Sequence, residues 1–70
     1  MSNGEHVYKT IEITGSSTTS IDDAIRQAIA KASQTVRQLD WFELTQVRGT
    51  IADGDVGYLQ ATLKIGFRLE

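Results

Sequence analysis

The stretch QLDWFELTQVRG, residues 38–49, lies where a helical spacing of apolar residues gives way to an alternating one. Within the alternation Phe42 and Leu44 share one phase, whereas Val47 has the opposite phase. One extra residue near Thr45 or Gln46 restores the phase, and this predicts a β-bulge. With the bulge, the side chains expected to face a helix are Phe42, Leu44, Val47 and Ile51. The side chains expected on the opposite face are Trp41, Glu43, Arg48 and Thr50. The alternation therefore turns Trp41 away from the core.

Upstream of this stretch, residues 21–38 repeat apolar side chains at helical spacing, which predicts one amphipathic helix of about five turns. Ser20 with Asp23 three places later is a capping-box pattern at the helix start, with Asp in place of the usual Glu. Alternation over residues 6–13 predicts a half-buried strand. The segment TGSSTTS that follows is rich in hydroxyl residues, and we expect it to form a loop.

Downstream, Asp53-Gly54 predicts a two-residue hairpin turn, and residues 58–69 alternate clearly enough to predict a long strand. The order strand, helix, strand, strand predicts a single α+β domain, residues 1–70, with a three-stranded antiparallel sheet wrapped around one helix. A strand of 13 residues spans roughly 43 Å at 3.3 Å per residue. An 18-residue helix spans only roughly 27 Å. We therefore expect other copies of the chain to cover the overhanging sheet.

Length and composition restrict the possible functions. A chain of 70 residues buries only about 60% of its unfolded surface, so a lone copy is marginally stable and assembly is favoured. The absence of Cys and the single His argue against disulfides and a multi-His metal site. A net charge of −2 and a pI near 5.2 argue against nucleic-acid binding. No apolar stretch suits a membrane span or a signal peptide, and we expect a cytoplasmic protein.

No catalytic motif is recognisable, but one outward face carries a potential binding site. Trp41 offers a plane for stacking a flat heteroaromatic ligand. Gln60 offers a donor and an acceptor for the edge of such a ligand, and Arg48, expected beside Gln60 in the hairpin, could pair with a phosphate or carboxylate. The alternative is that Trp41 fills a subunit interface and that Arg48 pairs with Glu43 or with an acid on a neighbouring copy.

Four segments of the chain resemble the dodecin family in order and spacing: VYKTIEITG, SIDDAIRQAIAKASQTVRQLDWFEL, VRGTI and TLKIGFRLE. The resemblance implies β-α-β-β subunits assembled as a hollow homo-dodecamer with tetrahedral symmetry. It also implies antiparallel pairs of flavins on two-fold axes, sandwiched between two copies of Trp41. Gln60 matches the glutamine that hydrogen-bonds the ring edge, Arg48 an arginine near the pocket, and Asp40 a residue near the ribityl chain.

The resemblance further implies flavin storage and photoprotection rather than catalysis. Bacterial members of the family generally favour FMN, and riboflavin, lumichrome and FAD remain alternatives. Some family members bind coenzyme A, and the basic residues here that could meet its phosphates are His6, Lys31, Arg37 and Arg68. The chain departs from the family before Gln60, where Leu59 replaces a frequent aromatic residue and Tyr58 stands one place earlier. Two alternatives remain: a flavoenzyme with an open flavin face, and a structural or coenzyme A-binding oligomer without flavin.

Overall fold

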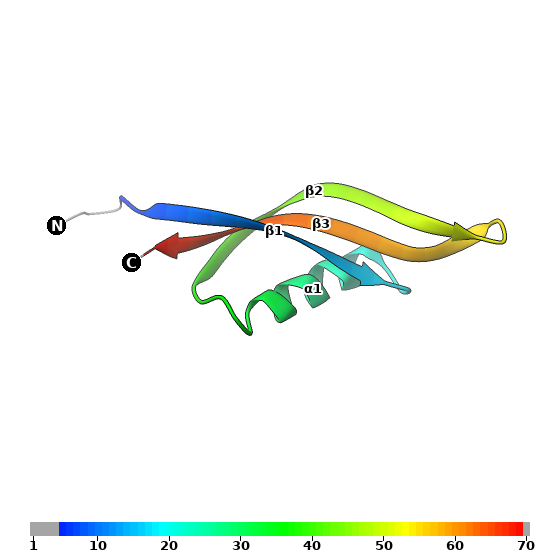
Figure 1. The fold of residues 1–70 in the computed structure, drawn as a ribbon, viewed down its shortest axis with the longest axis horizontal. Helices are drawn as coiled ribbons and strands as arrows, with labels where there is room; N and C mark the ends of the chain where they lie inside the picture. The colour runs from blue at the N-terminus through cyan, green and yellow to red at the C-terminus, as the bar shows by residue number, and fades with distance from the viewer. Residues whose placement is uncertain (1–4, 70) are drawn as a thin grey trace.

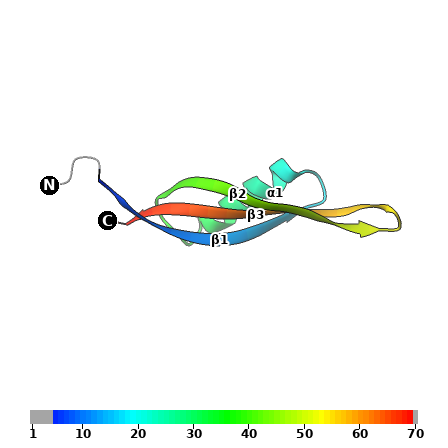
Figure 2. The same cartoon turned by 90° about the horizontal axis from the view of Figure 1, so that it is seen from above.

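The structure, a computed structural model, describes residues 5–69 as one helix on one face of a three-stranded sheet (Figure 1). The elements are β1 (Val7–Ser17), α1 (Ile21–Ala32), β2 (Leu39–Ala52) and β3 (Asp55–Leu69). β3 is the central strand and pairs antiparallel with β1 on one side and β2 on the other; Figure 2 shows the order β1-β3-β2. The predicted α+β architecture is confirmed.

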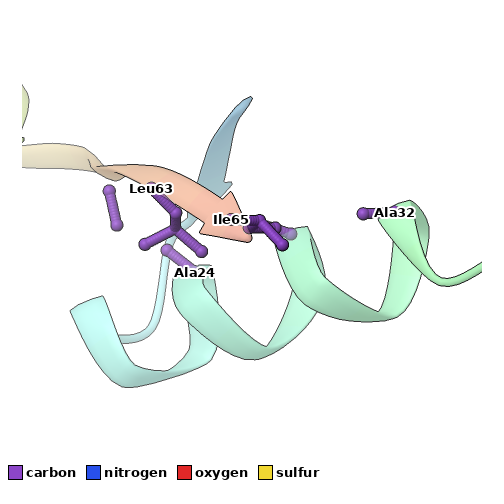
Figure 3. Close-up of a cluster of buried hydrophobic side chains, with 6 residues drawn as sticks. Ala24, Ala32, Leu63 and Ile65 are labelled. Atoms are coloured by element: carbon purple, nitrogen blue, oxygen red, sulfur yellow. The ribbon is translucent and has the colours of Figure 1, made fainter. Parts of the chain in front are cut away.

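The core lies between α1 and the strands β1 and β3. Three alanines at successive turns of α1 are buried against Leu63 and Ile65 of β3 (Figure 3). These alanines are Ala24, Ala28 and Ala32. Gly15 on β1 permits the close approach, because a Cβ there would overlap the carbonyl oxygen of Ala24. Small residues on both sides thus let the helix pack closely on the sheet.

The start of α1 follows the prediction in part. The Ser20 side chain accepts a hydrogen bond of 2.9 Å from the backbone N–H of Asp23, as an N-cap should. The Asp23 carboxylate does not complete a capping box; it accepts bonds from Ser17 (2.6 Å) and Gln27 (2.7 Å). The expected loop is also shorter, because β1 continues to Ser17 and pairs with Leu59. Ser17 is buried and its hydroxyl organises the turn into the helix.

The predicted helical end at residue 38 is wrong, because α1 ends at Ala32. Hydroxyl groups beyond this point bond to helix carbonyls: Ser33 Oγ to Ala30 O at 2.8 Å, and Thr35 Oγ1 to Ala32 O at 3.4 Å. Such side-chain bonds compete with continued helix. Gln38 then adopts a left-handed φ of 62° and redirects the chain into β2.

The β2–β3 hairpin extends past the helix as a two-stranded arm, at the right of Figure 1. Asp53 and Gly54 turn the chain with φ values of 54° and 75°, which suits a type I′ hairpin turn. The molecule is accordingly elongated, with extents of 59 × 20 × 14 Å. The helix is shorter than predicted, so the uncovered part of the sheet is larger than the sequence suggested.

The apolar side of β2 does not lie under the helix, contrary to the prediction. Phe42, Leu44 and Val47 pair with the buried residues of β3 and share their face, but α1 packs mainly on β1 and β3. Their side chains are 47%, 41% and 52% exposed, and Ile51 is 83% exposed. The predicted bulge is confirmed, with Thr45 as the extra residue between the Leu44 and Gln46 pairs.

Candidate functional site

The sheet face away from α1 carries the residues that the sequence selected for binding. The registers place on this face alternate residues of all three strands, among them Tyr8 and Ser16 of β1, Gln60 and Gly66 of β3, and Trp41 and Arg48 of β2. No helix covers this face among residues 5–69. It is therefore a broad, open surface for a ligand or a second copy of the chain.

A bulge at Asp40 orients Trp41. Leu39 pairs with Phe67 while Trp41 pairs with Gly66, so β2 uses two steps where β3 uses one. Without the extra residue, Leu39 and Trp41 would face the same side. With it, Leu39 packs against the core and Trp41 faces the open side. Bulges commonly redirect a side chain beside a functional site.

The Trp41 indole lies flat across the backbone of Gly66. A Cβ added at Gly66 would lie 2.7 Å from Nε1 and would overlap Cε2 and Cζ2 of the ring. Gly66 is buried although no helix covers its face, whereas the Trp41 side chain remains 41% exposed. One face of the indole thus rests on the sheet, and exposed indole surface remains available for stacking.

Tyr8 of β1, which was not predicted as a site residue, completes this corner of the surface. Its ring centroid lies 6.3 Å from that of Trp41 with the planes tilted by 51°. Its hydroxyl donates a 2.8 Å hydrogen bond to Oδ2 of Asp40. That bond, with some burial and the Asp40 charge, raises the pKa of Tyr8 above its ordinary value, and Arg68 opposes the shift. Its phase in β1 placed it on this face, but only the β1–β3 register places it beside Trp41.

Gln60 and Arg48 form a second group on the same face. They are direct partners across the ladder, and Arg48 Nε donates to Gln60 Oε1 at 3.0 Å. Gln60 Nε2 in turn donates to Ser16 Oγ at 3.1 Å. The expected proximity of Arg48 and Gln60 is confirmed, and Arg48 pairs with Gln60 rather than Glu43. An amide that makes these two bonds still has one N–H and one oxygen lone pair to offer a ligand.

The two groups are far apart within one chain. Trp41 pairs with Gly66 and Arg48 with Gln60, so six strand residues, roughly 20 Å at 3.3 Å each, separate them. The structure brings Asp40 close to Trp41 and Arg48 to Gln60, but it does not bring the pairs together. A ligand the size of one ring system reaches both groups only if a second copy supplies one of them.

The four basic residues considered for coenzyme A are also dispersed. Arg37 and Arg68 line one open hollow of about 450 Å³, together with Phe67 and Val36. Lys31 lines a neighbouring, mostly apolar hollow of about 330 Å³ between α1 and β1, and both hollows are lined by Val36. His6 lies just before β1 and is exposed. Only Arg37 and Arg68 therefore share a candidate phosphate site.

Three further features bear on the function. Leu59, the residue that departs from the family pattern, is half-buried opposite Gly49, while Tyr58 is 54% exposed. Within residues 5–69, no three His, Cys, Asp or Glu side chains are grouped as a metal site would require. No helix in that range is long and apolar enough to cross a membrane.

Comparisons with known proteins agree on one family. The Dodecin family model matches residues 7–70. Dodecin from Thermus thermophilus is 47% identical over 64 residues, 91% of this chain and 93% of that protein. The structure of dodecin from Streptomyces coelicolor superposes with a TM-score of 0.90 at 53% identity, covering 97% of both chains. A more distant structure, described as a calcium dodecin from Mycobacterium tuberculosis with a novel calcium-binding site, is 25% identical with a TM-score of 0.79 over 91% of both chains.

Proposed function

The chain belongs to the dodecin family, and on that premise we propose that it binds flavins between its own copies, storing them and protecting them from light. FMN is the favoured ligand. The observation that carries the proposal is the Trp41 indole, held flat on Gly66 and 41% exposed on the sheet face that no helix covers. A large aromatic plane left open in this way is suited to stacking a flat ring system.

Assembly follows from the surfaces that one copy leaves exposed. Phe42, Leu44 and Val47 form an apolar row on the edge strand β2, and such rows on a small domain favour association. The homo-dodecamer that the family resemblance implies would cover this row. Light scattering measures the particle mass directly. A mass near twelve chains supports the proposal, and a monomer contradicts it.

The binding slot would lie on a two-fold axis. Two indoles that enclose two stacked flavins are separated by three stacking gaps of about 3.5–4 Å, or about 11 Å in all. Gln60 and Arg48, which are remote from Trp41 in the same chain, would then come from the neighbouring copy or meet the outer end of the ligand. The amide of Gln60 suits the alternating donor and acceptor edge of the isoalloxazine. Arg48 suits the FMN phosphate, and Asp40 the ribityl hydroxyls.

The site favours protection over turnover. When bound, the flavin supplies a light-absorbing, electron-accepting ring, and the chain supplies an electron-rich indole in contact with it. Rapid electron transfer between stacked rings returns the excited state to the ground state and quenches emission. A flavin enclosed on both faces has no open side for a substrate. A flavoenzyme is therefore less compatible with this arrangement.

Titration with FMN tests the proposal. We expect strong quenching of both flavin and Trp41 emission in the unmodified protein, and its loss in Trp41→Ala. Glu43→Ala, which changes another exposed β2 residue on the same face, is the matched control and should bind normally. Unchanged flavin emission with an intact oligomer would reject flavin storage and favour a purely structural assembly.

Coenzyme A is a second candidate ligand, supported by the hollow that Arg37 and Arg68 share. Two guanidinium groups around one concavity suit a phosphate-bearing ligand. We expect the double variant Arg37→Ala/Arg68→Ala to weaken coenzyme A binding, while Lys31→Ala, in the neighbouring, mostly apolar hollow, leaves it unchanged. Calorimetry with coenzyme A measures both, and equal affinities in the two variants would exclude this site.

A further inference from the structure

The corner around Trp41 is more than a surface with an exposed aromatic residue. We propose that Gly66 and the Tyr8–Asp40 pair are positioning residues, which fix the plane of the Trp41 indole in the ligand-free chain and so set the width of the flavin slot. This inference rests on the proposed function for the identity of its ligand. The contacts that position the indole are present in the ligand-free chain.

Gly66 provides the floor. A methyl group at this position would occupy the space of Cε2 and Cζ2 and would lie 2.7 Å from Nε1. These atoms belong to the fused ring system, so the overlap cannot be relieved by moving a flexible side-chain end; the whole indole must shift outward. The φ angle of Gly66 is not positive, so its backbone conformation does not require glycine. The requirement for glycine therefore comes from the indole above it.

Tyr8 and Asp40 provide the side wall. The Tyr8 ring stands beside the indole at 6.3 Å and 51°, a tilted arrangement that aromatic pairs favour. The 2.8 Å bond from its hydroxyl to Asp40 links β1 to the bulge residue adjacent to Trp41. Three strands thus meet at one side chain: β1 through Tyr8, β3 through Gly66 and β2 through the bulge.

The arrangement has a consequence for ligand selection. A side chain held in one orientation loses less entropy when a ligand stacks on it, which strengthens binding. An indole lifted off Gly66 would also move toward its counterpart across the two-fold axis. Two stacked rings require about three gaps between the indoles, so a lifted indole would admit the pair poorly. Gly66 is therefore a specificity-determining position as well as a support.

A double-mutant cycle in ligand-free protein tests the floor. We expect Gly66→Ala to lower the thermal midpoint when Trp41 is present and to be neutral or stabilising in the Trp41→Ala background, because Ala suits a strand better than Gly. If Gly66→Ala folds only when Trp41 is also removed, the proposal is supported. If both proteins fail to fold, or if Gly66→Ala has the same effect in both backgrounds, the proposal is overturned.

Flavin titration tests the consequence for the slot. We expect Gly66→Ala, where it folds, to weaken FMN binding about tenfold, since stacking on one aromatic plane supplies an effect of this order. Tyr8→Phe keeps the ring but removes the hydrogen bond, and we expect about threefold weaker FMN binding with lower Trp41 fluorescence anisotropy, because the indole is held less firmly. Gly57→Ala, on the same strand but distant from Trp41, is the control: its Cβ meets the Thr50 hydroxyl rather than the indole, and it should bind FMN within about twofold of the unmodified protein.

The stability cycle and the FMN titration together distinguish a failure of flavin binding from a failure of the role assigned to Gly66. If the unmodified protein does not bind flavin, the proposed function fails and the stability cycle alone decides whether Gly66 seats the indole. If the unmodified protein binds flavin and Gly66→Ala binds it equally well, the proposed function stands and the role of Gly66 in the slot is refuted. Unchanged affinity and anisotropy in Tyr8→Phe would remove Tyr8 and Asp40 from the positioning set.

Discussion

The two faces of this one sheet are built from alternate residues of the same strands, yet they are organised differently. On one face, Leu63 and Ile65 of β3 are covered by the alanines of α1 and are fully buried. On the other, Gln60 and Gly66 meet side chains from the two outer strands, through hydrogen bonds and an indole laid on the backbone. The covered face stabilises the fold, and the open face is free to bind. A shift of one residue along a strand therefore decides whether a side chain joins the core or the open surface.

The largest expected effect is a loss of stability from a substitution on the covered face. Leu63→Ala removes a fully buried side chain, and we expect a loss of about 2–5 kcal/mol in the free energy of unfolding. Its neighbour Thr62 points to the open face and shares a 2.9 Å hydrogen bond with Thr14. Thr62→Ala should lower stability by only about 0.5–1.5 kcal/mol. Denaturant unfolding at one fixed protein concentration measures both, and similar losses would show that the faces do not differ as described.

The second-largest expected effect is a loss of FMN affinity from a substitution on the open face. Trp41→Ala should weaken FMN binding by about 1–3 kcal/mol, roughly 5- to 150-fold, while leaving the helix-covered core intact. Phe42→Ala is the control, because Phe42 is the next residue along β2 and faces the other side. Equilibrium titration gives the affinities. If Phe42→Ala weakened FMN binding more than Trp41→Ala in a correctly assembled particle, the assignment of faces would be wrong.

A smaller effect is the loss of stability at acid pH. Hydrogen bonds from Ser17 and Gln27 hold the pKa of Asp23 below its ordinary value of 3.8. A carboxyl group with a lowered folded pKa contributes stability above the unfolded pKa and loses it as the pH falls through the folded value. The unmodified protein should therefore lose more stability below pH 3.8 than Asp23→Asn does. Thermal melts over an acid pH series measure the difference, and parallel curves for the two proteins would contradict it.

The smallest effect is the loss of stability at basic pH. The hydrogen bond to Asp40 raises the pKa of Tyr8 above 10.0. A group with a raised folded pKa contributes stability that is present below the unfolded pKa and is lost as the pH rises through the folded value. Stability above pH 10 should therefore fall more steeply in the unmodified protein than in Tyr8→Phe. Tyrosinate absorbance during a base titration locates the transition, and a midpoint below 10 for Tyr8 would contradict the assigned bond.

The sequence predicted one of the bulges in β2 and not the other, for a physical reason. At Thr45, apolar residues stand on both sides, so the change of phase between Leu44 and Val47 is visible. At Asp40, only Leu39 precedes the bulge within the strand, directly after the predicted helix end at residue 38, so no alternating residues upstream reveal the change of phase. A phase change needs several residues on each side to be recognised. The sheet face of Trp41 was nevertheless predicted correctly, because Trp41 and Phe42 alternate downstream of the Asp40 bulge and so face opposite sides with or without it.

Element ends were harder to predict than element types. Val36 continues the apolar spacing of the helix, so the pattern alone could not show that α1 ends at Ala32. Gly15, Ser16 and Ser17 resemble a loop in composition, yet they pair with β3, and residue 15 is a glycine because the helix passes directly over it. Tyr8 was missed as a site residue because its relation to Trp41 depends on strand order. Such contacts between distant segments leave no local signal in the sequence.

The crystal structure of the assembled protein with FMN tests the central claim most directly. We expect two flavin rings between the Trp41 indoles of neighbouring copies, with the indole planes about 11 Å apart and each indole still lying on its Gly66. A structure in which the two indoles contact each other, or in which FMN lies elsewhere while the open face packs against protein, would contradict it.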